Sequence, residues 1–399
     1  MRLGVLPEAI ELNGPIWIHA VSVGEAMAAK QLVKELRAAY SGKRFFITTV
    51  TPTGNKIARS FAGENDFVAY LPLDLSFIVR RVVEKIKPSL FILMETEIWP
   101  NLISCLHHKQ VPIVIVNGRL SDRSFKGYSR IRFLLKPVLD KIALFCLQTP
   151  LDEERLSRLG VNKDRIRVTG NMKFDNADHS NRRILESGDK YKALLGLKFP
   201  DRLLVCGSTH AGEEEIVLSV YKGLLKEFSG LKLLIAPRHP ERACKIQEMV
   251  SACGFHGVLA SGFPYKPCNC LTNPVFILDV IGELVCYYNI SDIVFVGGSL
   301  IKKGGHNILE PASLGKPVIT GPYMFNFRDI SGLFLENKAC LVASNEEELK
   351  GHIKFLLSDP GRAKELGSRA KELVLKNQGT TTRNARFITE LLPLNKKGE

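Results

Sequence analysis

Three ionisable side chains in the first half of the chain stand where a predicted strand ends: Glu25, Glu95 and Lys173. Glu25 follows the apolar run Ile16–Val21 through a Ser-Val-Gly turn and lies in the first turn of an alanine-rich helix. A carboxylate there can complement the helix dipole, for about 0.3–1 kcal/mol. It can equally serve as a general base at the mouth of a substrate cleft. The spacing alone leaves both interpretations open.

In the second half, the polar clusters suit an anionic ligand. Arg238 follows a predicted strand and stands between Pro237 and Pro240, which would present its guanidinium rigidly. A guanidinium held in this way can bind a phosphate, although an ordinary surface arginine would look the same in the sequence. Gly282 and Glu283 follow another predicted strand.

The segment from residue 296 to 312 combines four glycines with His306, Asn307 and Glu310. Glycines permit close approach of a ligand to the backbone, and Asn307 can cap a helix that begins near Leu309. A helix N-terminus beside glycines is suited to phosphate. Glu310 could bind a ribose diol, or could simply complement the dipole of that helix.

Several common functional classes are disfavoured. The first strand is not followed by G-x-G-x-x-G, and neither a P-loop nor a G-x-S-x-G elbow occurs, which argues against nicotinamide or flavin enzymes, P-loop NTPases and serine hydrolases. Of the histidines, His19, His210, His239 and His306 could be combined into a metal set, but their spacing does not support one. The pair Cys268 and Cys270 lacks a second zinc-spaced pair, so we expect no metal, no cofactor and no disulfide framework.

The elements that must position these residues alternate between strands and helices. The strand interiors are apolar without alternation, which indicates parallel sheets covered on both faces. The pattern restarts after a polar stretch. We therefore predict an α/β protein with two Rossmann-like domains facing across a cleft. The predicted boundaries are 1–176, a linker at 177–200, 201–376, and a C-terminal helix at 377–399 that packs back on the first domain.

Charge is unevenly distributed. With 55 Lys and Arg against 41 Asp and Glu, the chain carries a formal charge of +14, which favours anionic partners. The stretch 119–136 interleaves six cations with aromatic and aliphatic residues, a composition suited to an anionic membrane interface or to an ordinary basic surface helix. Its charge would also suit nucleic acid, but no known nucleic-acid-binding motif accompanies it, so we expect no nucleic-acid partner.

Seven motifs in consistent order, from about residue 14 to 330, resemble the 3-deoxy-D-manno-octulosonic acid (Kdo) transferases of Gram-negative bacteria. They are His19-Ala-Val-Ser-Val-Gly-Glu25, Met94-Glu-Thr-Glu-Ile-Trp-Pro-Asn101, Thr169-Gly-Asn-Met-Lys-Phe-Asp175, Gly207-Ser-Thr-His210, Ala236-Pro-Arg-His-Pro-Glu-Arg242, Ile281-Gly-Glu-Leu284 and the glycine segment through Ala312. The resemblance implies the GT-B architecture of two Rossmann-like domains. It also implies transfer of Kdo from CMP-Kdo to a lipid A precursor (lipid IVA), with inversion, in lipopolysaccharide biosynthesis.

Residue by residue, the resemblance makes Glu25 the general base and makes Glu95 and Lys173 stabilisers of the transition state. It assigns the first domain to the acceptor and the second to the donor. The positions that match its CMP-binding segments are Pro237, Arg238, Ile281, Gly282, Glu283, Asn307, Ile308, Leu309 and Glu310.

The resemblance further implies a place at the cytoplasmic face of the inner membrane. Family members usually carry an N-terminal hydrophobic anchor, whereas this sequence starts close to its first strand. Either an anchor lies outside the sequence, or attachment is peripheral and relies on the basic surface, for which 119–136 is the candidate.

Two other classes stay open at this point. A GT-B enzyme of another kind, a UDP-sugar transferase or a UDP-N-acetylglucosamine epimerase, would share the fold and Glu310. A non-enzymatic protein that binds anionic membranes or nucleic acid would share the basic charge.

Overall fold

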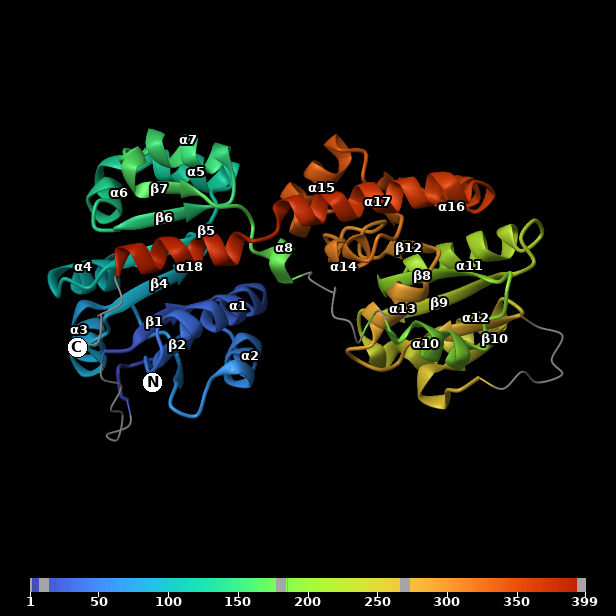
Figure 1. The fold of residues 1–399 in the computed structure, drawn as a ribbon, viewed down its shortest axis with the longest axis horizontal. Helices are drawn as coiled ribbons and strands as arrows, with labels where there is room; N and C mark the ends of the chain where they lie inside the picture. Colours follow the sequence, from blue (N-terminus) through green and yellow to red (C-terminus); the bar gives the residue numbers. More distant parts are fainter. Residues whose placement is uncertain (1, 7–13, 177–183, 185, 266–272, 393–399) are drawn as a thin grey trace. The chain divides into compact units, whose positions relative to one another are not determined.

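The computed structural model describes residues 2–6, 14–176, 184, 186–265 and 273–392. The chain divides into two compact units, one formed by 1–176 together with 377–399 and the other by 177–376. Within the described residues, each unit is built on a seven-stranded sheet whose strands all pair in parallel (Figure 1). These two sheets confirm the predicted α/β class with two Rossmann-like domains.

The sheet of the first unit has the order β3-β2-β1-β4-β5-β6-β7, so the chain reverses its direction of travel between β1 and β4. Ile16 of β1 pairs with Phe45 on one side and Leu90 on the other. In open α/β sheets, ligands bind beyond the carboxyl ends of the strands at such a reversal. The strands are β1 (Ile16–His19), β2 (Phe45–Thr49), β3 (Phe67–Tyr70), β4 (Leu90–Met94), β5 (Ile113–Gly118), β6 (Leu144–Leu147) and β7 (Ile166–Val168).

Helices cover both faces of this sheet, which is why its strands are apolar throughout. On one face, Ile18 and Ile92 pack with Leu32 of α1 (Val23–Ala39), Ala58 of α2 (Pro52–Phe61) and Ile388 of α18 (Thr380–Leu391). The opposite face packs against α3 (Ser76–Ile86), α4 (Pro100–His108), α6 (Arg132–Leu139) and α7 (Pro150–Arg158). The remaining elements are α5 (Asp122–Arg130), η1 (Lys163–Arg165) and α8 (Lys173–Asn176).

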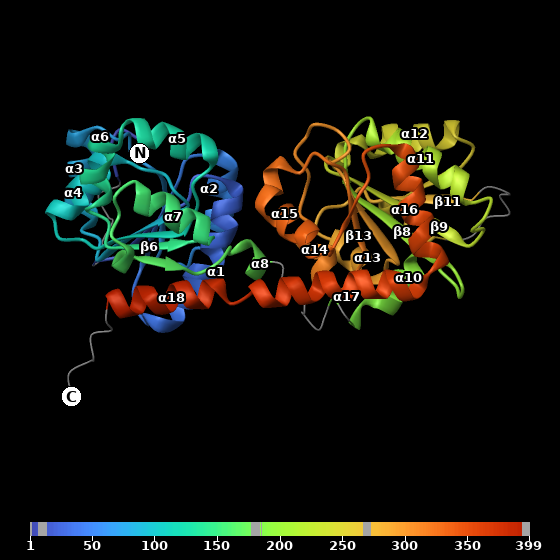
Figure 2. The same ribbon diagram turned by 90° about the horizontal axis from the view of Figure 1, so that it is seen from above.

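The C-terminal helix α18 belongs to the first unit and lies beside α1 (Figure 2). Ala385 and Ile388 are buried in the same apolar cluster as the inner face of α1. The hydroxyl of Tyr40, at the end of α1, donates to the carbonyl of Leu392 at 2.6 Å. The chain therefore leaves the first unit after residue 176 and returns to complete its core.

The sheet of the second unit has the order β10-β11-β9-β8-β12-β13-β14 and reverses between β8 and β12. Its strands are β8 (Arg202–Thr209), β9 (Leu231–Pro237), β10 (His256–Leu259), β11 (Pro274–Ile277), β12 (Ile293–Val296), β13 (Val318–Thr320) and β14 (Leu341–Val342). Its helices are α10 (Gly188–Leu195), α11 (Glu213–Leu224), α12 (Ala243–Ala252), α13 (Leu284–Ile290), α14 (Leu309–Ser313), α15 (Arg328–Glu336), α16 (Glu346–Ser358) and α17 (Pro360–Asn377), with short turns η2 (Pro240–Arg242), η3 (Ala260–Gly262) and η4 (Phe325–Phe327).

Part of the stretch predicted as a linker, 177–200, is ordered secondary structure. It forms α10, which packs against α13, and the ring of Tyr191 lies edge-on to Tyr287 with ring centroids 4.9 Å apart. Tyr191 and Leu195 are buried. Residues 177–183 and 185 of the predicted linker lie outside the described residues.

A close contact in the second sheet allows a test of its packing. A Cβ added to Gly207, in β8, would lie 1.9 Å from the hydroxyl oxygen of Tyr288, whose side chain is fully buried. We expect Gly207→Ala to lower the free energy of unfolding by about 1–3 kcal/mol through overpacking. Chemical denaturation followed by circular dichroism measures this change.

Gly351, in the exposed middle of α16, provides the matched control, because an added Cβ there meets nothing within 4 Å. Gly351→Ala should leave stability unchanged or raise it by about 0.5–1 kcal/mol, since alanine favours the helix. Equal effects of the two substitutions would contradict the packing described for Tyr288.

Candidate active site

The structure places Glu25 and Glu95 at the same edge of the first sheet. Glu25 follows β1 and Glu95 follows β4, and these two strands are neighbours at the reversal of strand order. The charge of Glu95 acts on the Glu25 carboxyl, and so does the charge of Glu97. Three carboxylates therefore gather where such a sheet binds its ligand.

Hydrogen bonds hold the Glu25 carboxylate in place at the start of α1. Its Oε2 accepts from the backbone N–H of Val21 at 2.8 Å, and its Oε1 accepts from the hydroxyl of Ser22 at 2.9 Å. Ser22 in turn caps the helix by accepting from the Glu25 N–H. This reciprocal arrangement fixes the side chain without engaging a cation.

Burial, which is the largest cause, and the negative charges of Glu95 and Glu97 together raise the pKa of Glu25 to about 7, against the opposing bonds from Val21 and Ser22. Burial also raises the pKa of Glu97, with Glu95 as the second cause. A carboxyl group with a pKa near neutrality can accept a proton at physiological pH and release it again. Glu25 therefore has the proton affinity that a general base needs, in addition to its bonds at the start of α1.

Glu95 has a strained backbone. Its φ of 57° lies in the left-handed region, which costs a non-glycine residue about 1–3 kcal/mol. Its N–H remains bonded to the carbonyl of Val116 at 2.8 Å, so the turn begins directly after the sheet ladder ends. Such strain is characteristic of functional sites, where the surrounding structure holds a side chain in an otherwise unfavourable position.

Lys173 begins α8, in a loop that follows β7 and is held from two sides. On one side, Asn117 accepts from the N–H of Met172 at 3.0 Å, and Asn171 donates to Gln148 at 2.8 Å. On the other side, Asp175 accepts from residues at the start of α18. The loop therefore depends both on the sheet edge and on the returning C-terminal helix.

In the second unit, Arg238, Asn307 and Glu310 come from loops after β9 and β12, the two strands that flank β8. The amide of Asn307 donates to Glu310 at 3.1 Å, and its oxygen accepts from the N–H of Leu309 at 3.1 Å. The N-cap position of α14 is Ile308, so Asn307 bonds to the first residue of the helix from one position before the predicted cap. Burial raises the pKa of Glu310, while Asn307 and the positive charge of Arg238 lower it. Arg238 itself is exposed, so its guanidinium is accessible to a ligand.

The other expected donor-binding residues fall into two kinds. Ile308 and Leu309 are fully buried, so only their backbone groups could contact a nucleotide, and Pro237 is buried at the end of β9. Ile281 is 87% exposed, and Gly282 has a φ of 96° that favours glycine. Glu283 stands at the start of α13.

Sequence reasoning missed Glu213, which organises this edge of the second sheet. Its buried carboxylate accepts four backbone N–H groups at 2.7–3.0 Å, one from His210 and three from Gly298, Ser299 and Leu300. It therefore joins the loops after β8 and β12. The sequence offered one signal, an acidic helix start directly after a strand, but three of the four partners lie more than 80 residues away in the sequence.

Three of the four histidines considered as a metal set come together in the second unit, whereas His19 lies in the first. His210 contacts both His239 and His306. Within the described residues, no group of three His, Cys, Asp or Glu side chains is arranged to hold a metal ion. Cys268 and Cys270 lie outside the described residues.

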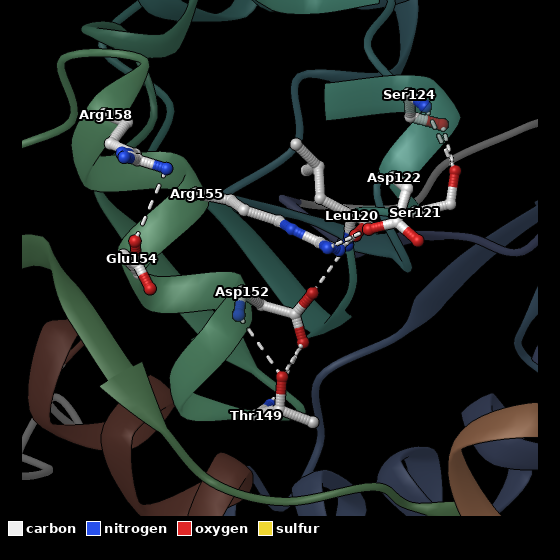
Figure 3. A network of polar contacts seen from close by, with 9 residues as sticks. All are labelled: Leu120, Ser121, Asp122, Ser124, Thr149, Asp152, Glu154, Arg155 and Arg158. Atoms are coloured by element: carbon white, nitrogen blue, oxygen red, sulfur yellow. Dashed lines mark hydrogen bonds and ion pairs between the residues drawn. The ribbon is translucent and has the colours of Figure 1, made fainter. Parts of the chain in front are cut away.

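The basic stretch 119–136 forms α5 and the first part of α6 rather than one continuous helix. Figure 3 shows how α7 anchors its start: Asp152 accepts from the N–H of Leu120 at 2.7 Å, and Arg155 bonds to the Leu120 carbonyl and to Asp122. None of the residues of α5 is buried. At the junction with α6, Ile131, Phe133 and Leu134 are 45–75% exposed among exposed cations.

Comparison with known proteins identifies the family. A family model described as 3-deoxy-D-manno-octulosonic-acid transferase (kdotransferase) matches residues 1–176, and one described as glycosyl transferases group 1 matches residues 271–373. A 3-deoxy-D-manno-octulosonic acid transferase of Haemophilus influenzae is 38% identical over 92% of this chain and 85% of its own length. The chain belongs to the Kdo transferase family. It is therefore a glycosyltransferase.

A second relative, the 3-deoxy-D-manno-octulosonic acid transferase of Chlamydophila psittaci, is 32% identical over 90% of this chain and 81% of its own length. Among solved structures, a UDP-GlcNAc 2-epimerase from Neisseria meningitidis bound to UDP-GlcNAc covers 95% of this chain and 99% of its own, with a TM-score of 0.62 and 13% identity. This likeness supports the GT-B fold and carries no information on the substrate. No helix in the described part of this Kdo transferase family member combines the length and the hydrophobicity needed to cross a membrane.

The bonds of Asp175 yield a prediction about the Lys173 loop. Asp175 accepts from the N–H groups of Gly379 and Thr381 at 2.7 and 2.6 Å and from the Thr381 hydroxyl at 2.6 Å. We expect Asp175→Ala to destabilise the first unit by about 1–3 kcal/mol, because these donors lose their partner. Hydrogen exchange should show faster exchange of amides in residues 380–391.

Glu390, in the same helix, supplies the control. Its side chain is 61% exposed and lies 3.6 Å from Arg386, so Glu390→Gln should change stability by less than about 0.5 kcal/mol. Unaltered exchange of α18 in Asp175→Ala would show that the helix does not depend on this carboxylate.

Proposed function

We propose that this enzyme transfers Kdo from CMP-Kdo to a lipid A precursor (lipid IVA) with inversion at the anomeric carbon, in lipopolysaccharide biosynthesis. The observation that carries the proposal is the Glu25 carboxyl, held by Val21 and Ser22 at the reversal of the first sheet with a pKa raised to about 7. Membership in the Kdo transferase family supports the sugar and the reaction class. An inverting transfer in a single displacement requires one base on the acceptor.

In the proposed reaction, Glu25 removes the proton of the acceptor hydroxyl as its oxygen bonds to the anomeric carbon of Kdo. The bond between that carbon and the phosphate oxygen breaks, and its electron pair leaves with CMP. Glu95 and Lys173 stabilise the charges that change in the transition state, Glu95 from a strained position that keeps its carboxylate at the sheet edge. The first unit thus supplies the groups that act on the acceptor.

The second unit binds the donor in this proposal. Arg238 contributes positive charge to the phosphate, and the bonded pair of Asn307 and Glu310 offers oxygen and amide groups to the ribose. Backbone groups at Ile308 and Leu309 complete the site, together with Pro237 and the exposed turn from Ile281 to Glu283. Because a guanidinium can neutralise the departing phosphate, we expect neither a metal ion nor another cofactor to be required.

A UDP-sugar enzyme is the second candidate, since the N. meningitidis structure shares the fold and was solved with UDP-GlcNAc. At 13% identity it shows the fold alone, whereas the H. influenzae Kdo transferase is 38% identical over most of both chains. A thermal-shift screen separates the two: CMP should raise the melting temperature and UDP should not.

The assay for activity is transfer from CMP-Kdo, generated in situ, to a tetraacylated lipid A precursor in detergent, with products identified by mass spectrometry. We expect Glu25→Gln to lower kcat by roughly 10²–10⁴-fold, because the amide cannot accept the proton. In the wild type, kcat/KM should rise as the pH increases through about 7 and then level off, since only the deprotonated Glu25 is active.

Glu64→Gln is the control, because Glu64 is exposed on the same unit outside the site. It should retain full activity and the same pH profile. Full activity of Glu25→Gln, combined with loss of the pH dependence in Glu97→Gln, would transfer the role of base to Glu97.

Activity that is insensitive to EDTA supports the metal-free mechanism, and loss of activity that Mg²⁺ restores would contradict it.

We further propose that the enzyme attaches peripherally to the cytoplasmic face of the inner membrane through 119–136. The exposed side chains of Phe133 and Leu134 are flanked in the sequence by the exposed cations Arg130, Arg132 and Lys136. Insertion of the apolar side chains into the bilayer and attraction of the cations to anionic lipid headgroups would therefore act on the same surface. The anchoring of α5 by Arg155 and Asp152 keeps this surface in a defined shape.

Co-sedimentation with phosphatidylglycerol-containing vesicles tests the attachment. The triple substitution Arg130→Glu, Arg132→Glu and Lys136→Glu should weaken binding by about a hundredfold, at roughly 1 kcal/mol for each cation removed. The control substitutes three exposed lysines of α17 by glutamate, Lys364, Lys371 and Lys376, which produces the same change in net charge. Equal binding of the two variants would refute a role for 119–136.

A further inference from the structure

Two histidine rings from separate loops of the second unit share a hydrogen bond. Nε2 of His210 lies 2.9 Å from Nε2 of His306, with the ring planes within 8° of parallel. Because a proton must lie between two nitrogens at this distance, one ring donates and the other accepts. The accepting ring, when neutral, carries its own proton on Nδ1. The pair therefore cannot hold a proton on both facing nitrogens.

The backbone fixes the position of both rings. The Glu213 carboxylate accepts from the N–H groups of His210 and Gly298, which joins the two loops that carry the histidines. Gly298 lies under the His306 ring: a Cβ added there would be 2.9 Å from its atoms, and Gly305 donates to the Gly298 carbonyl at 2.8 Å. The contact between the rings is thus built into the fold of the sheet edge.

Three cations and a third histidine lie close enough to act on the pair. Arg238 and His239 follow β9, Arg242 lies in η2, and Lys303 belongs to the glycine segment. Burial is the largest cause that lowers the pKa of both rings, and the neighbouring groups add to it, with His210 the next cause at His306. The pKa of His306 falls to about 4, and that of His210 is also lowered.

The carboxylates nearby are already engaged. Glu213 binds four backbone N–H groups, Glu214 is ion-paired with Arg242 at 2.7 Å, and Glu310 accepts from Asn307. The charge of Glu214 only partly offsets the cations at His210. The site thus combines positive charge with two imidazoles that burial keeps neutral. A bound anion would offset the positive charge and so favour protonation of a ring.

We propose that the His210–His306 pair is part of the donor phosphate site and takes up one proton when the phosphate binds. The inference rests on the proposed function, since the phosphate is that of a cytidine nucleotide beside Arg238. One added proton fits the geometry: it enters at the free Nδ1 of the donating ring and leaves the N–H···N bond intact. A second added proton would break that bond, so uptake stops at one.

The added proton has a role in the transfer. When the bond between the anomeric carbon and the phosphate oxygen breaks, the electron pair moves to that oxygen and the phosphate gains a negative charge. An imidazolium N–H stabilises this charge by a charge-assisted hydrogen bond. The proton comes from solvent as the donor binds and departs as CMP is released, which returns the pair to two neutral rings.

Isothermal titration calorimetry with 5′-CMP tests the proposal on the full chain at pH 7.5. Comparing the heat in two buffers of different ionisation enthalpy gives the number of protons taken up. We expect close to one proton per CMP in the wild type and none with cytidine, which lacks the phosphate. His306→Gln should abolish the uptake and weaken CMP binding roughly ten- to a hundredfold, as for loss of one charge-assisted hydrogen bond.

His256→Gln, on the edge strand β10, is the control and should retain both uptake and affinity. CMP binding without proton uptake, or the same uptake in His306→Gln and His210→Gln, would overturn the inference while leaving the donor site in place. A wild-type protein that binds no CMP would instead refute the proposed donor, and the inference with it.

Nuclear magnetic resonance of the histidine rings supplies a second test that needs no variant. Long-range ¹H–¹⁵N spectra of the wild type should show one Nε2–H and one Nδ1–H tautomer for the pair. Addition of CMP should raise the pKa of at least one of the two rings. Ring pKa values that CMP leaves unchanged would overturn the proposal even if the substitutions destabilise the protein.

Discussion

Burial of a parallel sheet on both of its faces constrains where each unit can place polar chemistry. The strands pack against helices above and below, so neither face can carry an uncompensated charge. Polar side chains can therefore gather only at the ends of the strands. At the reversal of strand order, the loops that follow two neighbouring strands diverge and leave space for a ligand. Glu25 and Glu95 lie at this place in the first unit, and His210 and the glycine segment lie at it in the second.

The two units put a buried glutamate in equivalent places and use it differently. Glu25 begins α1 after β1, and Glu213 begins α11 after β8. Glu213 accepts four backbone N–H groups, which satisfy its oxygens and make it a structural joint between two loops. Burial raises the pKa of both carboxyl groups. Glu25 has only two donors to oppose this effect and faces two like charges, whereas four backbone N–H groups oppose it at Glu213.

The features that could be predicted from the sequence are those that depend on the pattern of neighbouring residues. Apolar runs located most strands, and the strand-turn-helix pattern pointed to Glu25. The short edge strand β10 was missed because it carries little hydrophobic signal, with His256 and Gly257 among its residues. The partners of Glu213 and the meeting of His210 with His306 could not be predicted, because residues more than 80 positions apart become neighbours only through strand order.

Backbone strain at the strand ends follows from the same constraint. Glu95 and Ser208 both have a φ of 57°, and each stands at or just beyond the end of a strand beside the reversal. The cost, about 1–3 kcal/mol for each residue, is offset by the ladder bonds that continue around it, such as those from Glu95 to Val116 and from Arg238 to Thr209. The strained residues are therefore stable only because the buried sheet beneath them is rigid, which ties the chemistry of each site to the packing of its core.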